Sequence, residues 1–498
     1  MMHEKVDREV KAASRAAVPP DRRYRTWVAV LGIGLAVRLL IGLLTEPYSD
    51  ETYYRAWAEH LDFGYFDHPP LIAVVLAIFR FPRLASLTLG GLTLLALAGL
   101  ARALHGDPAA GWRAVALGAT LPAAVLGGTF ATVDLPLQLF WVLALWALVA
   151  RRDGWAGVAL GLALLSKYTG VLLLGTAVLA LSFRREWRRA ATVGVLALLL
   201  FSPVLAWNVA HGGESFLFQL RHGLEGRTRG AVLEYLGGQW AMAGPLFFPL
   251  AMVLLARARV PSLLKASVAL PFVFFLLAAF RTRQEVNWPA MAYLGACAAL
   301  AGVETRARRV AAWANAALCV AATIHLVLLP FPLRKDHVLH KLHGWTVLRA
   351  LKQTGASVVF APSYRLASEA WWLTRLPTAV AGSTRRSQYD LWPSPAPAVH
   401  GDAVWLAEQE PVPAQLAARF ASVDPPATLQ SHFRGRLLHT FKYFVLRDYL
   451  ERPKRLPETQ GAAPDLGAAA TPRCSVDEAI LFDGCVAPRS GAGPEATP

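Results

Sequence analysis

Charged residues are scarce in this chain. They make up 17% of its 498 residues, whereas hydrophobic residues make up 55% and the mean hydropathy is +0.38. This composition excludes an ordinary soluble protein and is typical of a protein that crosses a membrane many times. The formal net charge of +16 does not indicate a nucleic-acid partner, because the basic residues stand in short clusters between apolar runs, where they act as topology signals.

Cysteine is rare as well, with four residues, and no C-x-x-C pair or histidine-rich metal spacing occurs. Cys297 and Cys319 fall in apolar runs, where we expect them to serve as packing residues. Cys474 and Cys485 fall in the tail, and an outward-facing tail would allow a disulfide between them. No cofactor is predicted with certainty, and the use of a divalent metal stays open.

The sequence also lacks a cleavage site and an internal repeat. The first apolar run begins at Thr26 and has no small-residue cleavage site, so we expect a retained helix and not a signal peptide. Lipid and solute transporters often show inverted repeats with charges near the midplane, so a transporter is the weaker alternative here. A non-catalytic membrane scaffold is a third alternative.

Clusters of basic residues predict the topology. Those before Thr26 place the segment 1–25 in the cytoplasm by the positive-inside rule. The run 154–182 is too long for one helix and has arginines at both ends, so we expect a hairpin with its apex at Lys167. The other predicted spans are 26–45, 84–104, 113–129, 135–150, 190–207, 241–256, 266–280, 288–303 and 310–331. With the hairpin they give eleven crossings and place the chain after Pro332 outside.

The sequence therefore predicts a polytopic α-helical membrane protein with a small extracytoplasmic α/β domain. The transmembrane domain would span 26–332, with a first outward loop at 46–70. The α/β domain would span 333–450, because V-L-R-A-L-K-Q-T-G is typical of a helix and S-V-V-F-A-P and F-V-L-R-D-Y-L are typical of strands. The segment 451–498 is rich in Ala, Pro and Gly and is expected to be a poorly ordered tail.

The first outward loop is unusually acidic. It contains S-D-E-T-Y-Y-R-A-W-A-E-H-L-D-F-G-Y-F-D-H-P-P at 49–70. The spacing of Tyr54, Trp57 and Leu61 predicts an amphipathic helix lying in the membrane interface, which Ser49 or Asp50 is able to cap. From the residues alone, Asp50 is either this N-cap or part of a site.

Several ordered blocks resemble a known enzyme group. They are D-E-T-Y-Y-R-A-W-A-E-H-L-D-F-G-Y-F-D-H-P-P-L-I-A, T-V-D-L-P-L, G-L-A-L-L-S-K-Y-T-G, S-P-V-L-A-W-N-V-A-H-G-G-E-S-F-L-F-Q-L and E-V-N-W-P-A-M-A-Y. Together they resemble the GT-C glycosyltransferases that use polyprenyl-phosphate sugars, in the group of the protein O-mannosyltransferases and the lipid A aminoarabinose transferases. The likeness covers about 26–300, and S-Y-R-L-A-S-E-A with S-Q-Y-D-L-W more weakly resembles the outward domain of bacterial relatives.

The resemblance implies transfer of a sugar from a polyprenyl-phosphate donor to an acceptor hydroxyl, with inversion, at the outer face of the cytoplasmic membrane. Asp50 would be the general base and Glu51 would orient it or the acceptor. The acceptor stays open between a glycan, a glycolipid and a protein, and membrane lipid surrounds the enzyme. The candidates for substrate binding are Lys167, Asp134, His68, Asp67, Arg38, Arg283 and Asn287.

Each binding candidate also has a structural explanation. Asp134 is expected to cap the helix that follows it, and Asp67 and Asn287 fit a turn and an interfacial anchor. Arg38 lies within the first span, where snorkelling competes with anion binding. His68 stands where the aminoarabinose transferases carry a lysine, which leaves its contact with a phosphate open.

Overall fold

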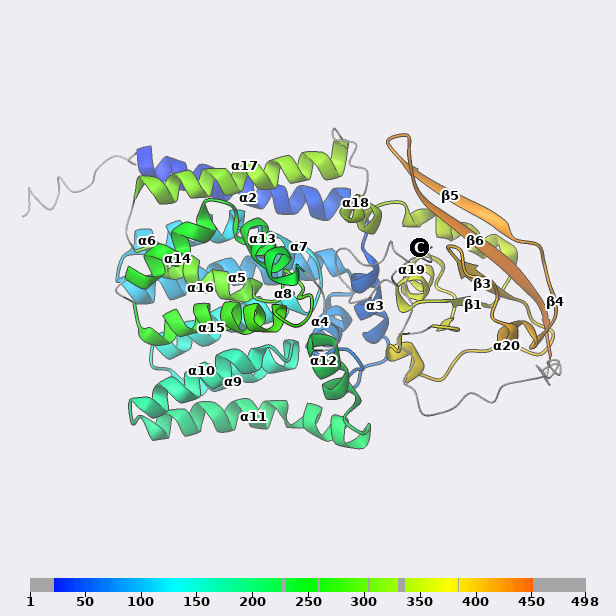
Figure 1. Cartoon of the computed structure of the whole chain (residues 1–498), viewed down its shortest axis with the longest axis horizontal. Coiled ribbons are helices and arrows are strands. Elements are labelled where there is room, and N and C mark those ends of the chain that lie inside the picture. Colours follow the sequence, from blue (N-terminus) through cyan, green and yellow to red (C-terminus); the bar gives the residue numbers. More distant parts are fainter. Residues whose placement is uncertain are drawn as a thin grey trace, which may run out of the picture.

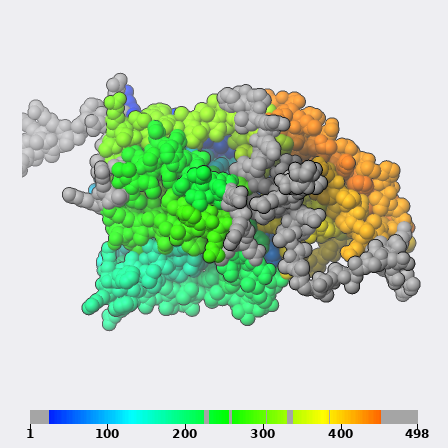
Figure 2. Space-filling view, viewed as in Figure 1, coloured from blue at the N-terminus to red at the C-terminus, as the bar shows by residue number. Residues whose placement is uncertain are grey.

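The computed structural model describes residues 22–224, 230–257, 260–302, 305–329, 336–383 and 385–450. They form a helical bundle and a smaller domain built around a sheet (Figure 1). In the space-filling view these parts are two adjoining masses, the bundle in blue to green and the domain in yellow to orange (Figure 2). The predicted segment 451–498, with Cys474 and Cys485, lies outside the described residues, as does most of 1–25.

The bundle contains long helices that run roughly parallel to one another, with shorter ones between them (Figure 1). Its helices are α2 (Arg22–Leu44), α3 (Ser49–Trp57), α4 (Leu71–Phe79), α5 (Pro82–His105), α6 (Pro108–Thr120), α7 (Pro122–Thr129), α8 (Asp134–Val149), α9 (Asp153–Ser166), α10 (Gly170–Phe183), α11 (Trp187–Ala210), α12 (Glu214–Leu224), α13 (Ala231–Ala243), α14 (Phe247–Arg257), α15 (Ser262–Ala279), α16 (Ala290–Leu300) and α17 (Arg306–Leu328). This arrangement confirms the predicted polytopic α-helical class.

Five of the described helices are long and apolar enough to cross a membrane alone: α2, α5, α11, α15 and α17. Two bent pairs, α6 with α7 and α13 with α14, raise this number to seven if each pair is one span. The predicted eleven crossings also need the four shorter apolar helices α8, α9, α10 and α16. The count of eleven therefore stays a prediction.

Two predicted spans are not single straight helices. The span 113–129 is bent by 75° between α6 and α7, because Pro122 lacks a backbone N–H and holds Leu121 in an extended conformation. The span 241–256 is bent by 98° between α13 and α14. There Gly244 has a φ of 89°, and the Asn315 side chain occupies the space where a Cβ would lie.

The run 154–182 forms two helices, as the sequence predicts. α9 ends at Ser166, and Lys167 has an extended backbone before α10 begins at Gly170. The side chain of Lys167 is buried, with a relative exposure of 6%. The break therefore presents a lysine at the end of the membrane bundle, inside the protein.

The helix after the first span differs from the expectation. α3 ends at Trp57, so Leu61 lies outside it and is exposed, and eight of its nine residues are buried. The predicted interfacial helix with one face in water is therefore wrong. The side chains of Tyr54 and Trp57, which suggested a membrane interface, are instead buried inside the protein. α3 packs against α19 (Tyr364–Thr374) of the smaller domain, where Tyr53 contacts Tyr364 (Figure 1).

The smaller domain is α/β, as predicted. A β-α-β unit joins β1 (Val358–Ala361) through α19 to β2 (Thr378–Val380), and β3 (Ala403–Ala407) pairs with β1 in parallel. The long β6 (Arg436–Tyr449) adds antiparallel to β3, and β4 (Phe420–Val423) and β5 (Ala427–Phe433) pair with β6. The remaining elements are α18 (His337–Leu342), η1 (Trp345–Thr354), η2 (Gln388–Asp390) and α20 (Ala414–Ala417).

Hydrogen bonds fasten the domain to the end of the bundle. The carboxylate of Glu46, between α2 and α3, accepts bonds from the backbone N–H groups of Gly344, Trp345 and Thr346 at 3.2, 2.8 and 3.2 Å. The ring of Tyr53 lies 4.5 Å from that of Tyr364 on α19. The first loop is thus enclosed between two parts of the chain that are about 300 residues apart.

Candidate active site

A pocket opens where the bundle meets the smaller domain. The bundle contributes α3, the loop before α4, the first residue of α8, the break between α9 and α10, α12 and the loop before α16. The smaller domain contributes the first turn of α19 and the segment before η2. Six of the nine predicted site residues line this pocket, and Glu51 is next to one of them in the chain, whereas Arg38 and Arg283 do not line it.

Asp50 is the second residue of α3, and its half-buried side chain lines the pocket. The N-cap is Tyr48, and neither Ser49 nor Asp50 caps the helix, so the capping explanation for Asp50 is wrong. Among the residues that the structure describes, the Asp50 carboxylate has no hydrogen bond or ion pair. A carboxylate that lines a pocket without a partner is available to a substrate hydroxyl.

Glu51 is turned away from this pocket and is fully buried. Its carboxylate accepts bonds from the backbone N–H of Ala131 at 2.9 Å and of Tyr48 at 3.3 Å. It also forms an ion pair with Arg83 at 3.0 Å. The structure therefore does not bring Glu51 to the acceptor or to Asp50, and gives it contacts that hold α3 against α5 and the α7–α8 turn.

Lys167 and Asp134 form a buried ion pair in the pocket wall. Lys167 Nζ donates to Asp134 Oδ1 at 2.9 Å, and Asn287 Nδ2 donates to Asp134 Oδ2 at 2.7 Å. The N-cap of α8 is Val133, so the expected capping role of Asp134 is wrong. Three residues that the sequence singled out separately thus meet in one cluster, and the ammonium of Lys167 keeps N–H groups for another acceptor.

Asp67 joins the first loop to the smaller domain. It accepts a hydrogen bond from Tyr53 Oη at 2.7 Å and forms an ion pair with Arg385 at 3.1 Å. Tyr53 Oη in turn accepts from the backbone N–H of Gln388 at 2.7 Å. Asp67 is therefore more than a turn residue, because it fixes one wall of the pocket.

Two histidines face the same space in the neutral form. Burial, then the charges of Lys167, His222 and Arg385, lower the pKa of His68 well below its ordinary value. Burial, followed by Arg385 and Lys167, lowers the pKa of His222 to about 4. The ring of His68 thus offers the pocket a hydrogen bond and no positive charge, unlike the lysine at the matching place in the aminoarabinose transferases.

Glu285 lines the pocket beside three basic residues. Burial raises its pKa to about 7, and the charges of Arg283, Lys341 and Arg365 act in the opposite direction. Burial, then Arg365, lowers the pKa of Lys341 to about 8. Near neutral pH the carboxyl of Glu285 is therefore partly protonated, whereas the basic groups around it keep most of their charge.

Two expected arginines do not line the pocket. Arg38 is buried within the bundle, where its Nη2 donates to the carbonyl of Gly118 at 3.2 Å, so snorkelling does not describe it. Arg283 forms an ion pair with Glu234 at 2.8 Å. Within the described ranges, no group of three or more His, Cys, Asp or Glu residues is placed to hold a metal ion.

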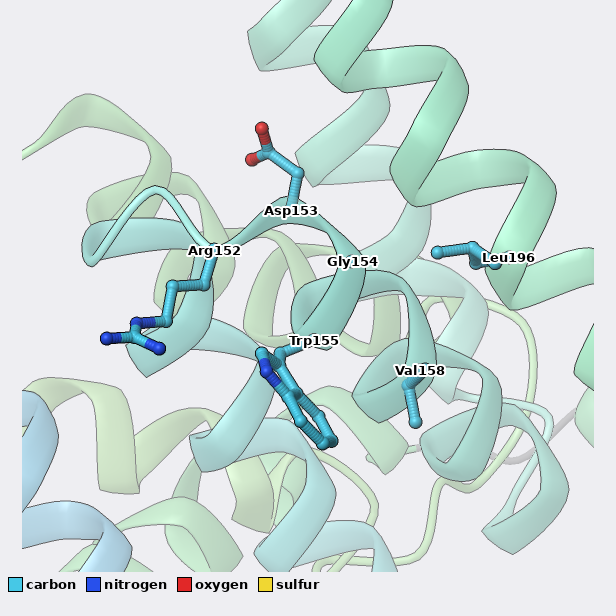
Figure 3. Close-up of a pocket in the computed structure, with 6 residues that line it drawn as sticks. All are labelled: Arg152, Asp153, Gly154, Trp155, Val158 and Leu196. Carbon is cyan, nitrogen blue, oxygen red and sulfur yellow. The ribbon is translucent and has the colours of Figure 1, made fainter.

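A second hollow lies at the opposite end of the bundle. Figure 3 shows Trp155 and Val158 at the start of α9, with Leu196 on α11 beside them. The carboxylate of Asp153 at this hollow binds Arg189 at 2.8 Å. Trp155 is 67% exposed, which fits an aromatic residue at the membrane surface, and the hollow has no set of reactive groups like that around Asp50.

Comparison with known proteins gives this geometry a context. Residues 67–207 match the family described as dolichyl-phosphate-mannose-protein mannosyltransferase. Over 84% of this chain and 97% of the other, the structure superposes on ArnT from Cupriavidus metallidurans bound to undecaprenyl phosphate, with a TM-score of 0.55 and 16% identity. This chain has the GT-C fold. The resemblance predicted from the sequence blocks is thereby confirmed, and the chain is a multi-pass membrane protein.

A curated relative is similar in sequence as well. The lipid A galacturonosyltransferase RgtD of Rhizobium johnstonii is 29% identical over 280 residues, which cover 50% of this chain. The match covers 59% of that protein, so the chain spans less than two thirds of the length of this relative. The apo form of ArnT from Cupriavidus metallidurans matches with the same TM-score of 0.55.

Sequence analysis missed most of the other residues that line the GT-C pocket, among them Tyr53, Glu285, Arg365 and Arg385. A signal for the last two was present, because Arg365 belongs to S-Y-R-L-A-S-E-A and Arg385 precedes S-Q-Y-D-L-W by two residues. Both blocks had been assigned only to an outward domain. Nothing in them shows that this domain supplies a wall of the pocket.

Proposed function

We propose that this protein is a membrane glycosyltransferase that moves a sugar from a polyprenyl-phosphate donor to an acceptor hydroxyl. One observation carries the proposal: the carboxylate of Asp50, which has no hydrogen bond or ion pair with the described part of the chain, lines the same pocket as the Lys167–Asp134 pair. This combination offers a proton acceptor and a cation within one buried space. Both are needed when a hydroxyl displaces a phosphate from a sugar.

The proposed reaction is a single displacement. Asp50 takes the proton of the acceptor hydroxyl while its oxygen forms a bond to the anomeric carbon. The bond from that carbon to the phosphate oxygen breaks, and the electron pair leaves with the lipid phosphate. Attack on the face opposite to the leaving group inverts the anomeric centre, and no covalent intermediate with the protein is formed.

Lys167 binds the phosphate in this proposal. Its ammonium has three N–H groups, of which Asp134 uses one, so the others are directed to phosphate oxygens. As the bond to the sugar breaks, negative charge grows on the phosphate, and the nearby cation stabilises it. His68, held neutral, adds a hydrogen bond to the same group, and Asn287 keeps Asp134 in place.

The donor and acceptor classes follow from the relatives. ArnT was solved with undecaprenyl phosphate, and RgtD is named for transfer of galacturonic acid to lipid A, so a polyprenyl carrier and a glycolipid acceptor are the first to test. We place the enzyme in the cytoplasmic membrane, with the domains 26–332 and 333–450 on either side of a pocket that faces outside. Metal dependence is left to the assay.

The experiment is a transfer assay with purified protein in detergent. Undecaprenyl-phosphate galacturonic acid is the donor probe and lipid A the acceptor probe, and the product is followed by mass spectrometry. We expect Asp50→Asn to fold normally and to lower kcat by about 10²- to 10⁴-fold, the range of a general base. The control Glu59→Gln, in the turn directly after α3, changes an exposed carboxylate and should remain active.

The outcomes separate the possibilities. Near-normal turnover by Asp50→Asn would remove the proposed base. Absence of transfer by the wild type from any polyprenyl-phosphate sugar, in envelope extracts as well as with lipid A, would remove the proposed function. Lys167→Gln should raise KM for the donor more than it lowers kcat, if its main contact is with the phosphate.

A further inference from the structure

The hollow at the start of α9 lies at the other end of the bundle from the pocket around Asp50 (Figure 3). Its volume is about 460 Å³, within the range of roughly 300–1,000 Å³ that is usual for small-molecule sites. It is lined by Arg152, Asp153, Gly154, Trp155, Val158 and Leu196. The proposed sugar transfer uses none of these residues, so it does not account for this hollow.

Two glycines of α9 shape the apolar part of the hollow. Gly157 lies so close to α11 that an added Cβ would be 2.8 Å from Leu196 Cβ, so the two helices are packed tightly there. A Cβ added to Gly154 would have no heavy atom within 4 Å, apart from its chain neighbours and the backbone of its own helix. Gly154 therefore leaves part of the hollow open to an apolar chain.

Tryptophan side chains indicate the depth of the hollow in the membrane. Trp155 is 67% exposed, and Trp187, at the start of the neighbouring α11, is 63% exposed. Tryptophan is enriched where the hydrocarbon meets the lipid headgroups, so the helix starts lie at this level. Val158 and Leu196 stand farther along their helices, and the apolar side of the hollow therefore faces the hydrocarbon.

Positive charge surrounds the hollow. The two turns beside it, 150–153 and 184–189, carry six arginines and two acids. Both acids, Asp153 and Glu186, are bound by Arg189. This end of the bundle is the one that the arginine clusters predict to be cytoplasmic, and it is strongly basic.

Arg152 places one of these charges at the edge of the hollow. Its side chain is exposed, and within the described ranges its guanidinium has no hydrogen bond or ion pair. In Figure 3 it extends to the same side of the α9 start as the Trp155 ring, whereas the carboxylate of Asp153 points the other way. Both oxygens of Asp153 accept from Arg189 Nε, at 2.9 and 2.8 Å, so an anion beside Arg152 does not meet an unpaired carboxylate of the hollow.

We infer that this hollow binds one anionic phospholipid of the membrane, with its phosphate at Arg152 and an acyl chain along Trp155 and Val158. Basic pockets between membrane helices on the cytoplasmic side are suited to the headgroups of anionic lipids. The planar guanidinium of arginine matches a phosphate with two parallel hydrogen bonds. The excess of arginine favours a lipid with a net negative charge over a zwitterionic one. The whole of α9 separates this lipid from Lys167 in the sugar-transfer pocket.

The experiment counts lipids bound to the purified full-length protein by native mass spectrometry in about 0.15 M salt, where long-range attraction between exposed charges is largely screened. The probes are phosphatidylglycerol and phosphatidylcholine with the same acyl chains. We expect the wild type to keep one phosphatidylglycerol and to bind it about fivefold more tightly than phosphatidylcholine. Arg152→Gln should weaken the binding of phosphatidylglycerol about tenfold, the effect of losing a hydrogen bond to a charged group.

Gly154→Leu tests the apolar part of the hollow. Its side chain would fill the open space, so lipids with either headgroup should bind more weakly by about tenfold or more. Phosphatidylglycerol should raise the unfolding temperature of the wild type and not that of Gly154→Leu, because only a protein that binds the lipid is stabilised by it. Neither measurement depends on sugar transfer.

Each variant has a matched control. Arg188→Gln removes an exposed arginine at the start of α11 that does not line the hollow, and it should change the affinity for phosphatidylglycerol about twofold or less. Gly175→Leu adds a leucine to α10, where an added Cβ also has open space around it, and it should leave the binding of lipid unchanged.

Four results would overturn the inference. Equal affinity of the wild type for the two phospholipids, or an Arg188→Gln variant as weak as Arg152→Gln, would show that the site does not recognise an anionic headgroup. A Gly154→Leu variant that keeps its phosphatidylglycerol would place the lipid elsewhere. Undecaprenyl phosphate that binds more tightly than phosphatidylglycerol, and is lost in Gly154→Leu, would make the hollow a second site for the carrier lipid.

Discussion

Replacing Glu51 by Gln should lower the stability of the protein and leave the turnover of the folded protein nearly unchanged. The two adjacent acids at the start of α3 differ in their surroundings: Asp50 lines the pocket, whereas Glu51 is fully buried and pairs with Arg83. Glutamine keeps the shape of glutamate but removes its charge and one acceptor oxygen. The backbone N–H of Ala131 or of Tyr48 then faces an amide N–H₂ group or loses its partner.

The size of the stability loss depends on how well Arg83 is still paired after Glu51 has lost its charge. Removing one partner of a buried ion pair typically costs about 3–5 kcal/mol, because the remaining charge stays buried. Arg83 keeps other acceptors, namely the carbonyls of Thr129 and Glu46 and the hydroxyl of Thr45 at 2.9 to 3.2 Å. We therefore expect the lower end of this range, about 3 kcal/mol.

Thermal unfolding of the purified variants in one detergent measures this effect. Glu51→Gln should unfold several degrees below the wild type, while the fraction that is folded keeps most of its kcat. Asp50→Asn, one residue away, should unfold at the wild-type temperature and lose kcat. A Glu51→Gln protein as stable as the wild type but without turnover would refute this division and would make Glu51 a catalytic residue.

Three further predictions concern the rest of the chain. Tyr53→Phe removes the hydroxyl that donates to Asp67 and should cost about 1–3 kcal/mol, seen as earlier thermal unfolding; an unchanged stability would contradict the docking of the smaller domain. Burial raises the pKa of Glu285 from 4.5 to about 7, so the free energy of unfolding should fall as pH rises through this window; Glu285→Gln should remove that part of the pH dependence of the unfolding temperature. A topology reporter fused after Arg185 should be cytoplasmic and one fused after Pro332 should be outside, and a cytoplasmic second reporter would refute eleven crossings.

Local signals predicted much of the fold. Apolar length and flanking arginines were enough to place the hairpin break at Lys167, because both act within one segment. The bend at Pro122 also has a local cause, but the prediction treated the apolar run 113–129 as a single helix and did not include the bend. The bend at Gly244 depends on Asn315, which occupies the space beside it from a helix about 70 residues away.

The candidate site was less accessible to sequence reasoning, because long-range packing decides it. The spacing of apolar residues in α3 predicted a helix lying on the membrane surface. In the structure a domain that begins nearly 300 residues later covers this helix. Asp50 and Glu51 are neighbours in sequence, and only the packed structure shows which one reaches the pocket. Arg385 meets Asp67 across 318 residues, a contact that no local pattern encodes.

The distance along the chain between the two pocket walls also affects how the protein is made. The hydrogen bond from the Gln388 backbone to Tyr53 joins residues 335 positions apart. At about 5–20 residues per second, a ribosome needs on the order of tens of seconds to synthesise the second wall after the first has emerged. A nascent or truncated chain therefore carries Asp50 in the membrane without the groups that enclose it. Such a chain has an incomplete pocket, and we expect it not to consume lipid-linked sugar.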